Sequence, residues 1–216
     1  RSVVQANQLC NRLGMDTISA AATLACHREI TGINYHPDQV LSLLEKIARA
    51  TGDGRDLGQG AAAYAEKMGQ PQAAMAVKGM ELPAYDPRGA YGMALGYALS
   101  TRGGCHLRAY PISHEILRKP VSTDRFSFSG KARIIKISED LNAVVDSLAT
   151  CKFMFFAASL EEYAAVYAAV TGVPSTAHDL MKKGEAIYYN ERIINAVNGF
   201  GAKDDDLPSR FFTENG

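Results

Sequence analysis

A succession of helix stop and start signals is the feature that most constrains how this chain folds. Apolar residues at helical spacing lead to Gly14, which suits a left-handed C-cap, and Asp16 can cap the helix that follows. Ser159 with Glu162 three residues later forms a capping-box pattern. We expect a mainly α fold with helices over the approximate ranges 3–13, 16–32, 37–52, 57–68, 86–100, 131–151, 159–171 and 176–198.

The segments between these helices carry weaker signals. Residues 76–83 are apolar and interrupted by Gly79 and Pro83, which predicts an extended connector. Glycines 89, 92 and 96 crowd the helix expected over 86–100, and their cost in helix stability predicts a close backbone neighbour. No repeat of 20–50 residues is present, which argues against a solenoid.

Composition restricts the classes of function. The 23 Lys and Arg residues balance the 23 Asp and Glu residues, so no broad basic field attracts nucleic acid, although a compact anionic ligand remains open. No apolar run approaches the roughly 20 residues of a membrane span, and the first residues do not form a signal peptide. The chain opens within a helical pattern without an initiator Met, and we therefore expect a fragment of a longer cytoplasmic protein.

The four cysteines at positions 10, 26, 105 and 151 are far apart and form no CxxC pair that would bind zinc or a complete iron–sulfur cluster. We expect each to be a buried, reduced thiol, which is typical of a cytoplasmic protein.

Two motifs suggest chemistry that their context argues against. The glycine-rich segment 51–60 resembles a phosphate-binding loop, but a helix rather than a strand precedes it, so a helix–loop–helix connection is the better interpretation. Cys105 and His106 are adjacent and point in different directions, which makes a nucleophile–base pair awkward. The surrounding run of residues 101–108 combines two arginines, an imidazole and two glycines, and it suits an anionic or planar ligand.

A second candidate site lies near the end of the helix expected over 131–151. Asp146 and Cys151 are close in sequence, and aromatic residues follow at 153–156. A carboxylate can accept hydrogen bonds from the amino-pyrimidine edge of a pterin, and a thiolate can ligate iron. The alternative from the residues alone is an ordinary helix end with a buried thiol and a solvated carboxylate.

These motifs, in this order, resemble the tungsten-containing aldehyde:ferredoxin oxidoreductase family. The segments that carry the resemblance are 7–19, 77–89, 102–109, 146–153 and 205–211. The resemblance implies the two helical C-terminal domains of that fold, with residues 1–100 in one domain and 101–216 in the other. It also implies a tungstopterin, in which two molybdopterins hold one tungsten atom, and a nearby [4Fe–4S] cluster.

The resemblance assigns roles to individual residues. Cys151 corresponds to one cluster ligand, and His106 to the imidazole beside tungsten that handles the substrate carbonyl or its proton. The implied pterin contacts are Asn11, Met15, Asp16, Arg102, Gly103, Arg108, Asp146, Thr150 and Lys152.

The chain also departs from the family pattern. Asn11 stands where the family has Asp, Met15 where it has Leu, and Ala149-Thr150 where the second motif has Gly-Leu. An uncharged Asn11 replaces a charge-assisted hydrogen bond to the pterin with a neutral one.

One thiolate cannot hold a four-iron cluster, so we expect a missing N-terminal part or a partner subunit to supply the rest of the site. The implied activity is oxidation of an aldehyde with electron transfer to ferredoxin. A relative that reduces an aromatic thioester or oxidises a phosphorylated aldehyde is an alternative within the enzyme class. A non-catalytic helical interaction module or assembly subunit is the alternative outside it. Apolar surface left uncovered favours a partner or self-association into a homo-oligomer.

Overall fold

The computed structural model describes residues 1–119 and 121–215, and in this part of the chain it is mainly helical with two short strands. The mainly α prediction is therefore confirmed. The chain divides into two compact units, and each is described by itself. Unit 1 comprises residues 1–89, 97–105 and 204–216, and unit 2 comprises 90–96 and 106–203. The assignment of residues 1–100 and 101–216 to the two helical domains of the family stays a prediction.

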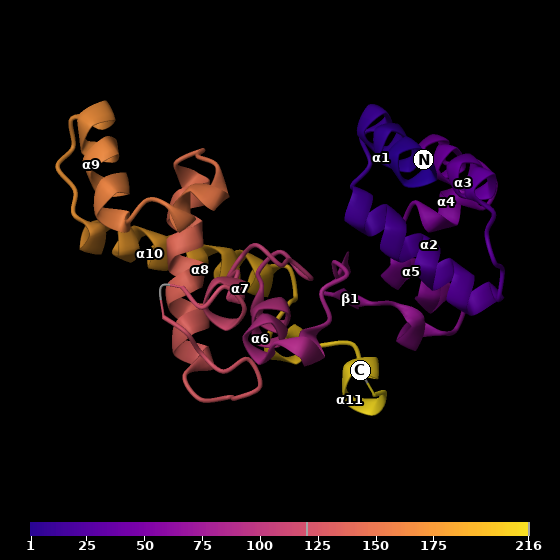
Figure 1. Ribbon diagram of the computed structural model, residues 1–216. Helices are drawn as coiled ribbons and strands as arrows, with labels where there is room; N and C mark the ends of the chain where they lie inside the picture. Colours follow the sequence, from indigo (N-terminus) through magenta and orange to yellow (C-terminus); the bar gives the residue numbers. More distant parts are fainter. Residues whose placement is uncertain (120, 216) are drawn as a thin grey trace. The chain divides into compact units, whose positions relative to one another are not determined.

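Unit 1 is built on a small group of helices around an apolar core (Figure 1). The helices are α1 (Ser2–Leu13), α2 (Thr17–Thr31), α3 (Pro37–Arg49), α4 (Gly54–Leu57) and α5 (Ala61–Lys67). Gly14 ends α1 in the left-handed region, at φ 72°, and the Asp16 carboxylate accepts the Ser19 N–H at 2.7 Å to begin α2. Leu44 and Leu57 are almost fully buried between these helices.

The glycine-rich segment 51–60 connects helices, as the sequence predicted. The helix expected over 57–68 begins later, as α5 at Ala61, because Gly60 adopts φ 93°; residues 54–57 form the separate short helix α4. A Cβ at Gly54 would lie 2.1 Å from the Lys46 carbonyl carbon, so glycine is required where α4 packs on α3.

The predicted connector over 76–83 is wrong in part, because it contains paired strands. Strands β1 (Ala76–Val77) and β2 (Met80–Glu81) pair in antiparallel register after the short 3-10 helix η1 (Pro71–Ala73). Lys78 and Gly79 both adopt positive φ, 48° and 79°, which suits a two-residue hairpin turn. The buried Lys78 ammonium pairs with Asp205 at 2.8 Å and donates to the Ala98 carbonyl at 2.6 Å.

The C-terminal segment of unit 1 begins at Asp204, which is the last residue of the 3-10 helix η4 (Ala202–Asp204). This segment contains α11 (Arg210–Thr213). The Arg210 guanidinium forms an ion pair with Glu29 on α2 and another with Glu214 at 3.1 Å. Charge pairing thus joins α11 to α2.

Unit 2 is organised around two long helices that cross, α8 and α10 (Figure 1). Its elements are α7 (Ile112–Glu115), α8 (Lys131–Ser147), η3 (Lys152–Phe156), α9 (Leu160–Thr171) and α10 (Ala177–Val197). A Cβ at Gly184 on α10 would lie 2.1 Å from the Asp140 carbonyl oxygen of α8, so the missing side chain allows the close crossing. The predicted capping box of Ser159 and Glu162 is present at the start of α9.

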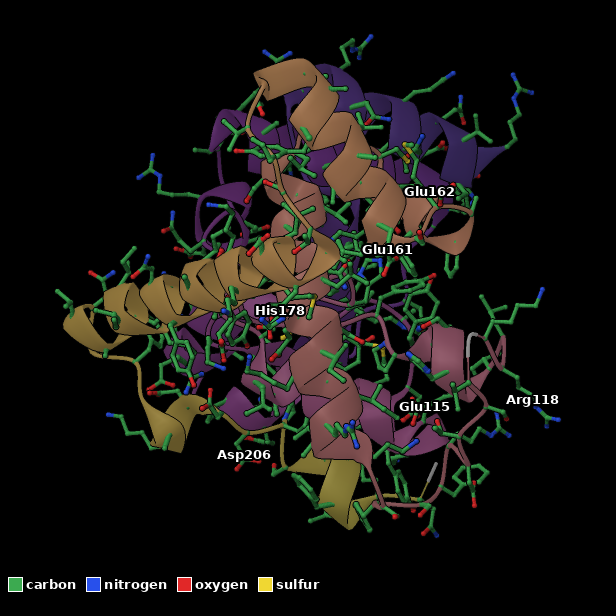
Figure 2. All side chains as sticks on the ribbon, turned by 90° about the vertical axis from the view of Figure 1, so that its left-hand side faces the viewer. Glu115, Arg118, Glu161, Glu162, His178 and Asp206 are labelled. Atoms are coloured by element: carbon green, nitrogen blue, oxygen red, sulfur yellow. The ribbon has the colours of Figure 1, made fainter. Side chains whose placement is uncertain are left out.

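Helix α6 (Tyr91–Leu99) follows the short η2 (Pro87–Gly89), so the helix expected from residue 86 begins later. Its first turn belongs to unit 2, where the Glu115 carboxylate accepts the N–H groups of Gly92 at 2.7 Å and Met93 at 3.2 Å. Lys131 neutralises this carboxylate at 2.5 Å, and neither side chain is exposed by more than 3%. In Figure 2 Glu115 lies within the fold, whereas Arg118 extends outward from it.

Helix α8 ends at Ser147, four residues earlier than the sequence predicted. Ala149 adopts a positive φ of 54°, which turns the chain away before Cys151. Among the residues described here, no helix is long and apolar enough to cross a membrane.

Candidate functional site

Four charged side chains meet at the C-terminal end of α8 in unit 2. Arg108 Nη2 lies 2.7 Å from Glu191 Oε1, and Arg108 Nη1 lies 3.6 Å from Asp146 Oδ2. The same Asp146 oxygen lies 3.0 Å from Lys152 Nζ. We call these four residues the charge cluster. It brings together three of the residues that the sequence predicted as pterin contacts, Arg108, Asp146 and Lys152.

The local structure explains how this cluster forms. The turn at Ala149 reverses the chain after α8, so Lys152 at the start of η3 returns toward Asp146. The Lys152 ammonium also donates to the Leu107 carbonyl oxygen at 2.8 Å, which anchors it beside Arg108. Two formal positive charges therefore face two formal negative charges.

Burial within the charge cluster is uneven. The side chains of Arg108 and Lys152 are 14% and 12% exposed, whereas those of Asp146 and Glu191 are 40% and 27% exposed. The Arg108 Nε–H is buried and has no hydrogen-bond acceptor among the described residues. The cluster thus combines buried cations with a carboxylate that remains open to solvent.

Cys151 and a group of aromatic rings adjoin the charge cluster in the sequence. Cys151 precedes η3 and is exposed, so the expectation of a buried thiol is wrong at this position. The preceding Thr150 hydroxyl donates to the Val145 carbonyl oxygen at 3.4 Å. The rings of Phe153 and Phe156 lie 5.9 Å from Tyr110, and the His106 ring lies 6.5 Å from Tyr110. An exposed thiol and an imidazole therefore lie in the same unit as the charge cluster.

The predicted contacts of the first pterin lie in unit 1. Met15 and Asp16 line a pocket of about 320 Å³ together with Gln59 and Glu81, whereas Asn11 is exposed on α1. Glu81 is buried, and its Oε1 accepts the Ala61 N–H at 2.7 Å. The pocket therefore has one side formed by the N-terminus of α2 and another by the loop before α5.

Arg102 and Gly103 also belong to unit 1. Arg102 is exposed, whereas Gly103 is buried with φ 101°. A Cβ at Gly103 would lie 2.6 Å from the Val77 carbonyl oxygen, so the close backbone approach that glycine permits is to the β hairpin. Its contact with a pterin stays a prediction.

The charge cluster suits a polar planar ligand better than a bare metal ion. No group of three or more His, Cys, Asp or Glu side chains that could hold a metal ion occurs in residues 1–119 and 121–215. A half-exposed carboxylate can accept hydrogen bonds from amino and ring N–H groups, and two cations can bind phosphate or carbonyl oxygens. Molybdopterin carries all of these groups, so the residues present fit it.

The sequence predictions missed Glu191. It lies 83 residues from Arg108 and reaches it from α10. No local pattern marks it, because only the packing of α10 against α8 brings it to the end of that helix.

Comparison with known proteins agrees with the fold. Residues 1–216 match the family model described as aldehyde ferredoxin oxidoreductase, domains 2 and 3. The chain belongs to this family of oxidoreductases.

The curated relatives that it matches come from the genera Pyrococcus and Thermococcus. The chain is 39% identical over 230 residues to the tungsten-containing aldehyde ferredoxin oxidoreductase of Pyrococcus furiosus, and 38% identical over 230 residues to that of Thermococcus kodakarensis. The enzyme of the same name from Pyrococcus horikoshii is 38% identical over 232 residues. Each match covers 99% of this chain but 38% of the relative, so the chain spans less than half the length of these proteins.

Proposed function

We propose that this chain forms part of a tungstopterin oxidoreductase that oxidises an aldehyde to a carboxylic acid. The reaction consumes one aldehyde and one water, and it yields the acid, two protons and two electrons. The electrons pass to ferredoxin through a [4Fe–4S] cluster. The observation that carries the proposal is the charge cluster, in which three residues predicted from the family motifs meet beside an exposed cysteine.

The charge cluster would hold one of the two pterins. The exposed Asp146 carboxylate would accept hydrogen bonds from the amino-pyrimidine edge, while Arg108 and Lys152 would supply positive charge to its oxygen or phosphate groups. Thr150 would contact the same pterin. When bound, the tungstopterin supplies the two-electron redox chemistry, and the protein supplies binding and orientation.

Two further residues of unit 2 would act near the reacting atoms. The His106 imidazole would donate a hydrogen bond to the aldehyde oxygen or accept a proton released from water. Cys151 would contribute one thiolate to the iron–sulfur cluster, because its exposure leaves the sulfur accessible.

Unit 1 would contact the other pterin through Asn11, Met15 and Asp16, with Arg102 and Gly103 as further contacts. The 320 Å³ pocket lined by Met15 and Asp16 supports this assignment, because it gives those residues a space to face. A missing N-terminal part or a partner subunit would supply the other cluster thiolates. A cytoplasmic location fits this electron-transfer role and the free cysteines.

The test is metal analysis combined with an absorption spectrum, carried out anaerobically. It uses this chain as purified and this chain together with the polypeptide that completes it. We expect tungsten and iron in the completed protein, with iron lost in Cys151→Ser and tungsten lost in Asp146→Asn. Asp38→Asn is the control, because Asp38 is an exposed carboxylate on α3. A metal-free completed protein with native helicity would refute the proposal.

The second candidate function is a helical interaction module. A row of apolar side chains on α10 favours it, because Tyr189, Ile193 and Val197 recur at intervals of four residues and are 57%, 60% and 82% exposed. Binding of a partner to this row without any metal content would favour the module over the oxidoreductase.

A further inference from the structure

We infer that Glu191 is a positioning residue for the proposed pterin site: it holds Arg108 and thereby keeps the Asp146 carboxylate available to the ligand. The inference rests on the proposed function for the identity of the ligand. Its geometric part concerns only the four residues of the charge cluster.

The distances show which carboxylate holds the guanidinium. Arg108 forms a charge-assisted hydrogen bond with Glu191 at 2.7 Å, whereas its nearest approach to Asp146 is 3.6 Å, too long for a hydrogen bond. Asp146 is instead hydrogen-bonded by Lys152 at 3.0 Å. Each cation thus has its own preferred carboxylate, and Glu191 is the preferred partner of Arg108.

Removing the charge of Glu191 changes which carboxylate each cation binds. Arg108 and Lys152 would then share Asp146 as the one carboxylate of the cluster, and the guanidinium fork is shaped to bind a carboxylate through two parallel hydrogen bonds. Asp146 would be drawn against Arg108, and its oxygens would be occupied. A ligand that needs the same oxygens for its amino groups would have to break that pair.

Burial makes the effect larger than that of a surface ion pair. The Arg108 side chain is 14% exposed, so the solvent screens its charge poorly. Its buried Nε–H finds no acceptor within residues 1–119 and 121–215, so the guanidinium is held through its two terminal nitrogens. Losing the Glu191 contact removes the shorter of those two attachments.

The first experiment measures binding of 6-hydroxymethylpterin to this chain by the fluorescence of the pterin. Glu191→Gln keeps the size of the side chain and an acceptor oxygen, and we expect it to weaken binding about tenfold, as for partners that orient ligand-binding groups. Glu185→Gln is the matched control, because Glu185 is on the same helix and pairs with Lys136 at 3.2 Å, outside the cluster. In an Arg108→Gln background, Glu191→Gln should have no further effect.

The second experiment needs no ligand. In the ¹⁵N-labelled chain, the Arg108 Nε–H signal is assigned by its loss in Arg108→Lys, and its exchange with water is measured. We expect Glu191→Gln to accelerate that exchange about tenfold, and Glu185→Gln to leave it unchanged.

The two experiments separate the possible failures. Unchanged Nε–H exchange in Glu191→Gln overturns the positioning role, as does unchanged pterin affinity. Accelerated exchange in a chain that binds no pterin leaves the positioning of Arg108 intact and counts against the ligand assigned in the proposed function. Equal weakening in Glu191→Gln and Glu185→Gln would mean a general loss of charge on α10 and would also overturn the inference.

Discussion

Replacing Glu139 with Gln should stabilise the fold at neutral and alkaline pH. Glu139 lies on α8 and is 4% exposed, and its Oε1 accepts the Tyr188 hydroxyl at 2.8 Å. Burial, and to a smaller extent the charge of Asp140, raises the pKa of this carboxyl to about 7, against the opposing effect of Tyr188 and of the cations Arg192 and Lys136.

The pH dependence of stability follows from the pKa values of Glu139 in the unfolded and in the folded chain. A carboxyl of this kind titrates near 4.5 in the unfolded chain and near 7 in the folded one. Between these values the folded state keeps a proton that the unfolded state has lost, so the free energy of unfolding falls as the pH rises from 4.5 to 7. At 1.36 kcal/mol per pKa unit, the ionised carboxylate costs the folded state about 3 kcal/mol above pH 7.

The assay is urea unfolding of wild type and Glu139→Gln at pH 5 and pH 8. Gln is neutral and can still accept the Tyr188 hydroxyl, so we expect a gain of about 2–3 kcal/mol at pH 8 and little difference at pH 5. The exposed Glu185→Gln should show no such pH dependence. A Glu139→Gln variant that is less stable at pH 8, or that is shifted equally at both pH values, would refute the reasoning.

Two further predictions concern packing and a buried ion pair in unit 2. Gly184→Ala should lower the free energy of unfolding in urea by about 1–3 kcal/mol, because the new Cβ would lie 2.1 Å from the Asp140 carbonyl oxygen. Helix propensity alone predicts a gain in stability, and a measured gain would contradict the close crossing of α8 and α10. Glu115→Gln should lower the free energy of unfolding by about 3–5 kcal/mol, because it leaves the 3% exposed Lys131 ammonium without its anion. Wild-type stability of this variant in the same assay would show that the ion pair is not needed for stability.

Much of the helical fold could be predicted because helix ends depend on neighbours in the sequence. The Asp16 carboxylate reaches the N–H of Ser19, three residues on, and the Ser159–Glu162 box closes over the same interval. Breaks that depend on one residue adopting positive φ were harder to predict. Ala149 adopts a positive φ just beyond the last residue of α8, so the helix ends before Cys151 although Ala is a strong helix former.

Most residues of the candidate site could be predicted from the sequence, whereas the contacts between them could not. The resemblance to a family named Arg108, Asp146 and Lys152, and the structure places them within one charge cluster. Nothing in the sequence pointed to Glu191, because it lies 83 residues from Arg108. The roles of these residues toward a pterin stay predictions.

The sequence by itself determined the helical class, most helix ends and the family, because caps, helical periodicity and ordered motifs are local properties of the chain. Only the tertiary structure decided which charged groups are buried and which carboxylate each cation binds. Glu139 and Glu115 are ordinary acidic residues in the sequence, and their burial depends on the helix faces that pack over them. Burial and long-range pairing arise from contacts between distant segments, which no local pattern encodes.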